Sequence, residues 1–340
     1  MRIAVLFGGT SQERDVSIAS AAQIIPALRA LGHEVYAVDT ATGRLPAAAE
    51  QQLLTSHVAP APPSVTTIAQ VRAHAVSLSS AQFDISTTDV VFLALHGGAG
   101  EDGRIQSLLD LAGMPYTGSN HIASAAAMDK DLAKRLFRSV GVPTADWLMA
   151  PAGAADVAQA ADVDRLLGWP VVVKPGKQGS TIGLTVVRAA DGLAAAIRAA
   201  RAFDDEVMIE KFIPGREFTV GILASQALPV GEIFPPGEIF DYQSKYQQGG
   251  ARELFPADLP PAESGQLQEY AQRAHRVLKL GAYSRIDFRR DPAGQFWCLE
   301  ANSLPGMTAT SLLPQAARAA GIDFPMLLER ICEGAIRPLR

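Results

Sequence analysis

Polar side chains recur at every second position in two short runs near the end of the chain. The runs are 283–288 and 296–299, and the sequence Asp291-Pro292-Ala293-Gly294 between them has the proline and glycine of a tight turn. The pattern therefore predicts a β-hairpin. Because side chains alternate between the two faces of a strand, one face would carry six of them: Tyr283, Arg285, Asp287, Cys298, Glu300 and Asn302.

The position of the turn predicts which residues of the hairpin lie opposite each other. With the turn centred on Pro292 and Ala293, the antiparallel pairs are 287 with 298, 285 with 300, and 283 with 302. Asp287 and Glu300 are then diagonal neighbours, with Cβ atoms about 7 Å apart. Their carboxylates, with the amide of Asn302, suit Mg²⁺, which usually adds water and substrate phosphates to its shell. The alternative is a solvated face with an Arg285–Glu300 ion pair.

The overall composition excludes several classes of protein. The chain has 340 residues, 48% of them hydrophobic, which suits two or three globular domains. A net charge of −5 without a basic run argues against a nucleic-acid partner. The two cysteines form neither a ligand cluster nor a disulfide framework. With no signal peptide and no apolar run that could span a bilayer, we expect a soluble protein of the reducing cytoplasm without a membrane partner.

Two loops near the N-terminus each follow a predicted buried strand. Glu13 comes shortly after the strand 2–7, and His96 directly after the strand 90–95, where open α/β sheets bind ligands. Glu13 can receive a substrate ammonium, or it can complete a helix capping box with Thr10. His96 opens a glycine-rich loop that can approach a ligand closely, but it can equally be an ordinary loop histidine.

A second glycine-rich segment, 174–183, joins two apolar runs that both predict strands. A Walker-type phosphate loop leads from a strand into a helix, so this segment predicts a flap over phosphates or a long hairpin turn. Lys174 ends the first strand, where burial is costly unless an anion compensates its charge. Lys130 lies in a predicted helix over 121–140, which usually places a lysine in solvent.

Two further segments complete the candidate site. Glu210 and Glu217 lie on either side of the turn Pro214-Gly215 between two predicted strands, where they can line an adenine pocket and accept from ribose hydroxyls. Edge carboxylates that limit aggregation are the alternative. The polar, aromatic stretch 237–259 has no clear periodicity and predicts a functional loop or lid.

Taken together, these segments resemble the ATP-grasp superfamily and, within it, the D-alanine–D-alanine ligases of peptidoglycan synthesis. The match spans nearly the whole chain in the family's order: FGGTSQERDVS, HGGAGEDG, PYTGSN, MDK, VVVKPGKQGSTIG, IEKFIPGREFTV, FDYQSKY, SRIDF and LEANSLPGMTATSL. The resemblance implies an α/β and α+β fold of three domains, which we place at 1–119, 120–206 and 207–340. The first is Rossmann-like with a parallel sheet, and ATP lies between two antiparallel sheets of the others.

The resemblance also implies roles for individual residues. Those expected at the nucleotide are Lys130, Lys174, Ser180, Glu210, Lys211, Phe212, Ile213 and Glu217. Asp287, Glu300 and Asn302 would hold two Mg²⁺ or Mn²⁺ ions, and K⁺ is a candidate activator. Glu13 would bind the first D-alanine's ammonium and join Ser180 and Tyr246 in a triad that closes the flap and lid.

The remaining implied roles concern the substrates and the reacting groups. Arg285 and the Gly306 N–H would stabilise the oxyanion, while Lys245 would meet the transferred phosphoryl group. His96 belongs to the substrate site, and Ser311 and Leu312 would hold the second substrate's carboxylate.

Tyr246 favours an amine as the acceptor, because relatives that make a D-alanyl-D-lactate ester resemble phenylalanine at this position. We expect a cytoplasmic homodimer that uses ATP and D-alanine. The alternatives are a ligase with another second substrate, such as D-serine or D-lactate, and a nucleotide-binding protein without catalysis.

Overall fold

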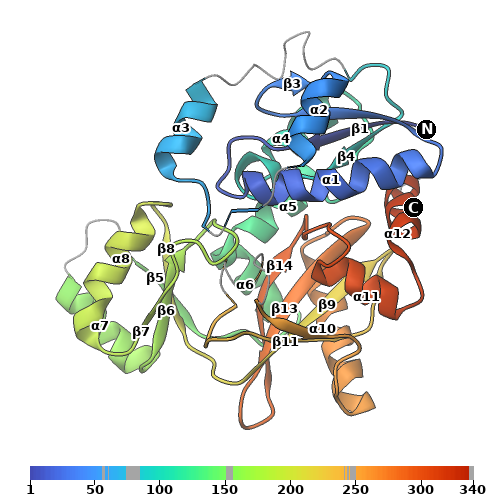
Figure 1. The fold of residues 1–340 in the computed structure, drawn as a ribbon. Helices are drawn as coiled ribbons and strands as arrows, with labels where there is room; N and C mark the ends of the chain where they lie inside the picture. Colours follow the sequence, from blue (N-terminus) through green and yellow to red (C-terminus); the bar gives the residue numbers. More distant parts are fainter. Residues whose placement is uncertain are drawn as a thin grey trace.

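The computed structural model describes residues 1–55, 58, 59, 61–73, 85–150, 156–240, 242, 245 and 250–336. Within that part of the chain the strands form three sheets, which occupy separate regions of the molecule (Figure 1). One is mostly parallel and comes from the N-terminal third, and the other two are antiparallel. No helix among the described residues is long and apolar enough to cross a membrane. The predicted combination of α/β and α+β structure is confirmed.

The N-terminal sheet has the strand order β3-β2-β1-β4, with β1, β2 and β4 parallel. Its strands are β1 (Arg2–Phe7), β2 (Glu34–Asp39), β3 (Gly43–Arg44) and β4 (Val90–Leu93). The helices of this region are α1 (Arg14–Ala30), α2 (Ala47–Leu54), α3 (Val65–Ala73) and α4 (Arg104–Leu111). From Ile3 onward β1 is fully apolar and buried, as expected of a strand covered on both faces. The carboxyl ends of β1 and β4 lead into the loops of Glu13 and His96.

The second sheet is antiparallel and has the order β5-β8-β6-β7. Its strands are β5 (Trp147–Ala150), β6 (Val171–Pro175), β7 (Thr185–Val187) and β8 (Val207–Lys211), and its helices are α7 (Asp156–Leu166) and α8 (Leu193–Arg201). Valines of the strands and the apolar face of α8 form one core. The glycine-rich segment 176–184 joins β6 to β7, so the predicted strand-to-strand loop is confirmed.

The third sheet has six antiparallel strands and carries the polar hairpin. They are β9 (Arg216–Leu223), β10 (Gln226–Ala227), β11 (Gly231–Phe234), β12 (Arg252–Leu254), β13 (Tyr283–Arg290) and β14 (Phe296–Asn302). One face packs against α5 (His121–Met128), α6 (Lys130–Ser139) and α10 (Pro261–Val277) through a core that includes Phe218, Ile286 and Phe288. The helix α11 (Leu312–Ala319) packs against β9 beside Gly221, where an added Cβ would lie 2.6 Å from Leu313.

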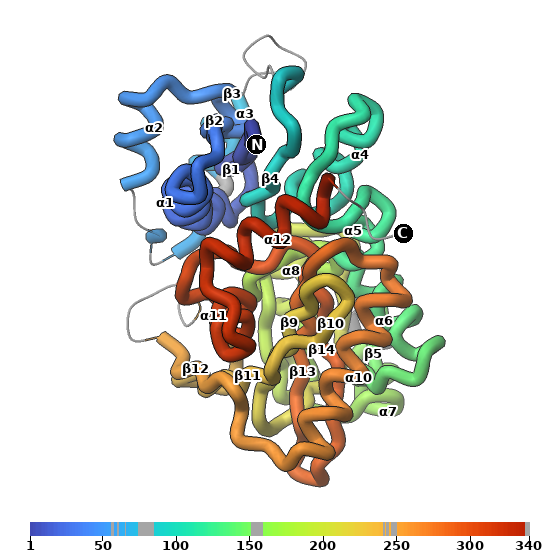
Figure 2. The backbone as a smooth tube through the Cα atoms, turned by 90° about the vertical axis from the view of Figure 1, so that its right-hand side faces the viewer, coloured from blue at the N-terminus to red at the C-terminus, as the bar shows by residue number. Residues whose placement is uncertain are grey.

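The last helix, α12 (Phe324–Ile336), returns to the N-terminal region and lies beside α1 and β4 (Figure 2). Its buried side chains, such as Leu327 and Ile331, share one core with the first sheet. Near one end of this contact His33 bridges the Met1 amine and the Glu329 carboxylate, at 3.2 and 2.6 Å. The two ends of the chain therefore stabilise each other and fix the N-terminal sheet over the third sheet.

The predicted register of the hairpin is wrong. The structure pairs Asp287 with Glu300 and Arg285 with Asn302 directly, and Phe288 with Cys298. The connection holds the five residues 291–295, closed by an Asp291 N–H to Gln295 oxygen bond of 2.9 Å, and an irregularity follows Asp287. Each feature moves the pairing by one position. Arg285, Asp287, Glu300 and Asn302 still share a face, but Cys298 lies in the core opposite Phe288.

One other expectation about local structure needs correction, and another is confirmed. The helix predicted over 121–140 is two helices, because Asp129 interrupts it and its carboxylate caps α6 by accepting from the Leu132 N–H at 3.0 Å. The two strands predicted on either side of the turn Pro214-Gly215 are confirmed as β8 and β9, and they belong to different sheets. The turn is thus the crossing between the two antiparallel sheets, which is where a nucleotide cavity is expected.

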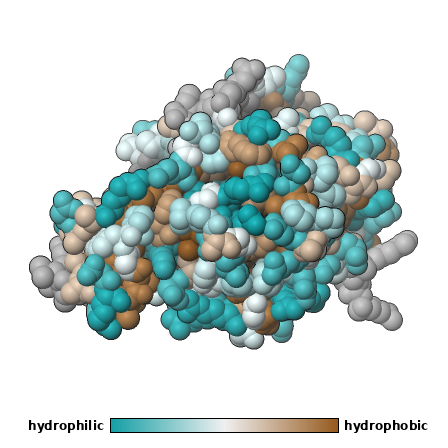
Figure 3. All heavy atoms as spheres, turned by 90° about the horizontal axis from the view of Figure 1, so that it is seen from below, coloured by the Kyte–Doolittle hydropathy of each residue, from teal (hydrophilic) through white to brown (hydrophobic). Residues whose placement is uncertain are grey.

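On the side seen from below, the described residues form no continuous apolar face (Figure 3). Figure 3 shows hydrophobic side chains there in separate patches among hydrophilic ones. Exposed apolar residues are normal on soluble proteins when they are scattered in this way.

Candidate active site

Two adjoining cavities lie at the centre of the molecule. The first, of about 860 Å³, lies between the two antiparallel sheets and is lined from β6, β8, β13 and β14. The second, of about 1010 Å³, lies between the third sheet and the N-terminal loops and is lined by Glu13, His96 and the segment 304–312. Phe240 and Lys245 line both cavities. Groups bound in the two cavities would therefore meet beside the ammonium of Lys245.

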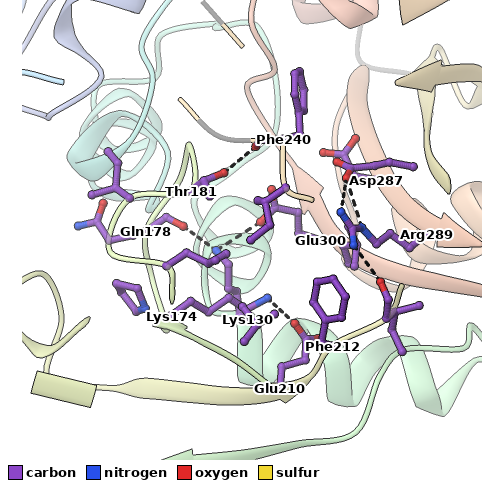
Figure 4. A pocket seen from close by; sticks show the side chains of 18 of the residues that line it. Lys130, Lys174, Gln178, Thr181, Glu210, Phe212, Phe240, Asp287, Arg289 and Glu300 are labelled. Atoms are coloured by element: carbon purple, nitrogen blue, oxygen red, sulfur yellow. Dashed lines mark hydrogen bonds and ion pairs between the residues drawn. The ribbon is translucent and has the colours of Figure 1, made fainter. Parts of the chain in front are cut away.

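Lysines and carboxylates surround the first cavity, with Lys130, Lys174 and Glu210 on one side and Asp287 and Arg289 on the other (Figure 4). Lys174 lies 2.6 Å from Glu210, as an ion pair of two buried side chains. Burial would raise the pKa of Glu210, but the charges of Lys134 and Lys174 outweigh it and lower the pKa to about 2. Glu210 is therefore ionised. Lys174, which pairs with Glu210, also lines the cavity, where its ammonium can pair with a phosphate instead.

Lys130 is not the solvent-exposed lysine that its helix suggested. Its ammonium donates to the Gln178 carbonyl of the flap at 2.6 Å and lies 3.4 Å from the Glu300 carboxylate. Burial would raise the pKa of Glu300, but Lys130, together with other cations, lowers it to about 2. Lys130 thus connects the flap to the hairpin across the cavity.

At the far end of the first cavity Arg289 occupies the place between the predicted base and ribose groups. Its guanidinium donates to the Ile213 carbonyl at 2.9 Å, lies 3.2 Å from the Glu217 carboxylate and stands 5.3 Å from the centre of the Phe212 ring. Sequence reasoning missed Arg289, although it continues the alternation of Arg285 and Asp287 on β13. Glu217 lines the cavity as expected, but here its partner is Arg289.

The predicted metal ligands converge on the shared face of the hairpin. Asp287 accepts from Thr219 at 2.7 Å, from Arg285 at 2.9 Å and from the Asn302 amide at 3.0 Å. Among the described residues no three His, Cys, Asp or Glu side chains form a metal-binding group. The set of two carboxylates and one amide, all oxygen donors, fits Mg²⁺ whose remaining ligands are phosphate oxygens and water.

Glu13 lines the second cavity as a buried side chain, and only one of its two carboxylate oxygens has a hydrogen-bond partner in the part of the chain that the structure describes. The Ser180 hydroxyl of the flap donates to its Oε1, while Oε2 is buried and has no hydrogen-bond partner among the described residues. The predicted capping box does not form, since Glu13 makes no side-chain cap at the start of α1. Burial raises the pKa of Glu13, and a cation beside Oε2 would restore its ionised form. Such a carboxylate is suited to an ammonium.

Two glycines leave room for this carboxylate. A Cβ added at Gly179 would lie 2.7 Å from Glu13 Oε2, and one at Gly97 would come closer still. Gly97 also has a φ of +65°, which side chains rarely adopt. Both loops can thus enclose Glu13 only because they lack side chains here.

We expect Gly179→Ala to reduce turnover about 100-fold, because the methyl group displaces the Glu13 carboxylate or opens the flap. The measurement is the rate of ADP formation with saturating amino acid and ATP. Gly237→Ala is the matched control, since an added Cβ there meets nothing within 4 Å. Equal rates for the two variants would contradict the role of the close approach.

His96 lines the second cavity, but both ring nitrogens already have partners. Nδ1 lies 3.1 Å from the Leu304 carbonyl and Nε2 lies 2.9 Å from the Ser20 hydroxyl. Burial lowers the pKa of His96 to about 4, so the ring is neutral at pH 7 and donates from Nδ1 to Leu304. His96 therefore connects the loop after β4 to the segment that carries Gly306.

Glu101 is a second residue that sequence reasoning missed. It is buried, and its carboxylate accepts from the backbone N–H groups of Gly97 at 2.8 Å and Leu304 at 3.3 Å. Burial, and then the nearby charge of Glu13, raise the pKa of Glu101 to about 8. The sequence does hold a signal for it, because Glu101 is an acidic residue directly after the glycine-rich loop 97–100 that follows β4.

The raised pKa of Glu101 predicts a pH effect on folding. The folded state holds a proton that the unfolded state releases near pH 4.5, so stability falls as the pH rises from about 5 to 8. We expect the free energy of unfolding of Glu101→Gln to fall less steeply with pH than that of the wild type, by up to about 1.4 kcal/mol per pH unit. Urea unfolding at pH 5, 6, 7 and 8 measures it. Parallel curves for variant and wild type would contradict the assignment.

The segment 304–312 completes the second cavity. Gly306, Ser311 and Leu312 line it together with Arg285. The Ser311 hydroxyl lies at the start of α11, 3.1 Å from the Thr308 backbone nitrogen, and does not cap the helix. The structure thus brings together the predicted substrate groups, except Tyr246, which lies outside the described residues.

Comparisons with known proteins match nearly the whole chain. A family model described as the D-ala D-ala ligase N-terminus matches residues 2–119, and one described as the D-ala D-ala ligase C-terminus matches residues 136–333. A D-alanine–D-alanine ligase of Gloeobacter violaceus is 41% identical over 99% of this chain and 100% of its own. One of Nitratidesulfovibrio vulgaris is 41% identical over 98% of this chain and 97% of its own.

Solved structures extend the comparison. The D-alanine–D-alanine ligase of Bacillus anthracis complexed with ATP superposes with a TM-score of 0.77 at 30% identity, covering 99% of this chain and 98% of that one. The ligase of Coxiella burnetii gives 0.80 at 28% identity, covering 99% and 94%. The fold and the cavity between two antiparallel sheets define an ATP-grasp enzyme. Within that superfamily, the chain belongs to the D-alanine–D-alanine ligase family.

Proposed function

We propose that this protein joins two D-alanine molecules at the expense of ATP, through a D-alanyl phosphate, in cytoplasmic peptidoglycan synthesis. The observation that carries the proposal is the carboxylate oxygen of Glu13 that is unpartnered among the described residues. Glu13 lines a cavity that meets the nucleotide cavity at Lys245. An amino acid held there by its ammonium would present its carboxylate toward the phosphate chain.

The first step is attack of the bound D-alanine carboxylate on the γ-phosphate, which breaks the bond to the bridging oxygen, releases ADP and gives the D-alanyl phosphate. Both reactants are anionic, so the site must supply positive charge and alignment rather than a strong nucleophile. Lys130, Lys174 and Lys245 line the nucleotide cavity and provide that charge. Asp287, Glu300 and Asn302 would hold Mg²⁺, which neutralises charge on the β- and γ-phosphates when bound.

The second step is attack of the second D-alanine's amine on the acyl phosphate carbonyl, with release of phosphate. Negative charge develops on the carbonyl oxygen, and we assign its stabilisation to Arg285 and the Gly306 N–H. Ser311 and Leu312 at the start of α11 would take the second carboxylate, since a helix N-terminus favours an anion. Ser180 and Tyr246 would close the flap and lid against water, which would otherwise hydrolyse the intermediate.

The proposal also covers the domain boundaries, the bound ions and the oligomeric state. We place the domains at 1–119, 120–206 and 207–340, where the first boundary precedes the Asn120 cap of α5 and the second precedes β8. We further propose two Mg²⁺ or Mn²⁺ ions, K⁺ as an activator, and a homodimer. Sedimentation measures the oligomeric state, and titration of KCl against turnover measures the dependence on a monovalent cation.

The proposed function is tested by phosphate release with one amino acid at a time. D-alanine alone should support turnover, while D-serine or D-lactate as second substrate should be slower. Absence of release with D-alanine alone, while D-alanine plus another acceptor supports it, would favour the related ligase with a different second substrate. Absence of release with every acceptor would favour a nucleotide-binding protein without catalysis.

A further inference from the structure

Helix α6 carries two lysines one turn apart, and only one of them lines the nucleotide cavity. Lys130 contacts the flap and faces the cavity, whereas Lys134 lies behind it with 1% of its side chain exposed. An ammonium so deeply buried is costly unless fixed partners surround it. The proposed reaction assigns Lys134 no role.

The partners of Lys134 hold it from several sides. Its ammonium donates to Glu210 Oε1 and, at 2.6 Å, to the Thr144 hydroxyl, and it lies 4.9 Å from the centre of the Trp147 ring. Thr144 in turn donates to the Cys298 carbonyl on β14 at 2.8 Å. Lys134 therefore joins α6 to both antiparallel sheets, and although burial lowers its pKa, the Glu210 carboxylate opposes that shift and stabilises its charge.

Glu210 also pairs with a second lysine, Lys174, which unlike Lys134 lines the cavity. Lys174 contacts Glu210 Oε2 at 2.6 Å, but it lines the cavity, where a phosphate would compete for it. If Lys174 turned to a phosphate and no other cation remained, Glu210 would be an uncompensated charge in the interior. Such an unpaired charge in the interior is strongly unfavourable. Lys134 prevents this because it cannot reach the cavity.

We propose that Lys134 is a positioning residue for the nucleotide base. It holds Glu210 ionised and fixed through Oε1, so that Oε2 becomes an acceptor for the base when Lys174 pairs with phosphate. An ionised carboxylate only accepts hydrogen bonds. It therefore favours adenine, which presents an amino donor at position 6, over guanine, which presents an oxygen there. The inference rests on the proposed function and on the expected position of Glu210 in the adenine pocket.

The test is calorimetric binding of Mg-ATP and Mg-GTP to the full chain with Lys134→Met. Lys174 still neutralises Glu210 in the free variant, so we expect it to fold. ATP affinity should fall at least 10-fold, and the preference for ATP over GTP should fall at least 10-fold. KM for ATP should rise more than kcat falls. Arg138→Met is the matched control on the same helix, since Arg138 also stacks on Trp147 but is 46% exposed.

A purely structural role of Lys134 predicts a different result. It would lower the melting temperature but leave the ATP preference and the ATP-induced rise in melting temperature unchanged, and that outcome overturns the proposal. Glu210→Gln and the double variant Lys134→Met/Glu210→Gln should bind ATP equally weakly, because Lys134 acts through Glu210. A further large loss in the double variant would also overturn it. Wild-type protein that fails to bind Mg-ATP would instead refute the proposed function.

Discussion

Replacement of Glu300 by glutamine should lower D-alanine-dependent ADP formation about 1000-fold. Glu300 is ionised, with its pKa lowered to about 2, and lies opposite Asp287 on the hairpin face. Glutamine keeps the shape but removes the negative charge that the cation and Lys130 require. Several kcal/mol of charge stabilisation in the transition state correspond to a rate change of this size. Steady-state kinetics across a Mg²⁺ titration measure both the rate and the cation requirement.

Glu232→Gln is the control for the Glu300 prediction. Glu232 is a buried carboxylate of the same sheet, paired with Arg216 at 2.7 Å, and it lines neither central cavity. It should lose stability but retain the normal rate. Nearly normal turnover of Glu300→Gln, or an equal loss in the control, would remove the metal assignment.

The second large effect is expected from Glu13→Gln. The amide can still accept from Ser180, but it loses the charge that Oε2 offers to an ammonium. Removal of one partner from a buried ion pair costs about 3–5 kcal/mol, so kcat/KM for D-alanine should fall about 150- to 5000-fold. ATP binding should be unchanged, because Glu13 does not line the first cavity. Initial rates against D-alanine concentration and ATP calorimetry separate the two effects.

Asp15→Asn removes the same charge two residues further along, and it should behave as wild type. Asp15 lies in the first turn of α1 and lines neither central cavity. If Glu13→Gln raised the KM for ATP instead of the KM for D-alanine, Glu13 would belong to the nucleotide and the assignment of the two cavities would be reversed.

The elements with strong local patterns could be predicted from the sequence. The buried strand β1 and the strand-to-strand flap have apolar runs bounded by glycines, and both are confirmed. The shared face of Arg285, Asp287, Glu300 and Asn302 followed from alternation alone. Side-chain periodicity thus carries information on which groups face the same way.

The exact pairing of the hairpin could not be obtained in this way. Alternation is unchanged when a strand slips by two residues, so the register depended on the length of the turn. The five-residue connection and the irregularity after Asp287 together shift it by two. This shift places Asp287 and Glu300 directly opposite each other and moves Cys298 to the other face.

The sequence also did not predict the site residues whose partners lie in distant segments. Glu101 contacts Leu304, and Arg289 contacts Glu217 and Ile213, across separations that no local pattern reveals. Lys134 has the spacing of an ordinary helix residue, and its burial depends on Glu210 from another sheet. Electrostatic partners from distant segments can be identified only from the folded structure, whereas the residues of the motifs can be identified from the sequence.

Transfer of ¹⁸O from labelled D-alanine tests the central claim most directly. With both carboxylate oxygens labelled, attack on the γ-phosphate should give inorganic phosphate that carries one ¹⁸O and a dipeptide whose amide retains the other. Mass spectrometry of phosphate and product after turnover with ATP and Mg²⁺ provides the measurement. Phosphate with one ¹⁸O for each dipeptide formed is the predicted result. Unlabelled phosphate alongside dipeptide formation would contradict the acyl phosphate and the arrangement of the two cavities around Lys245.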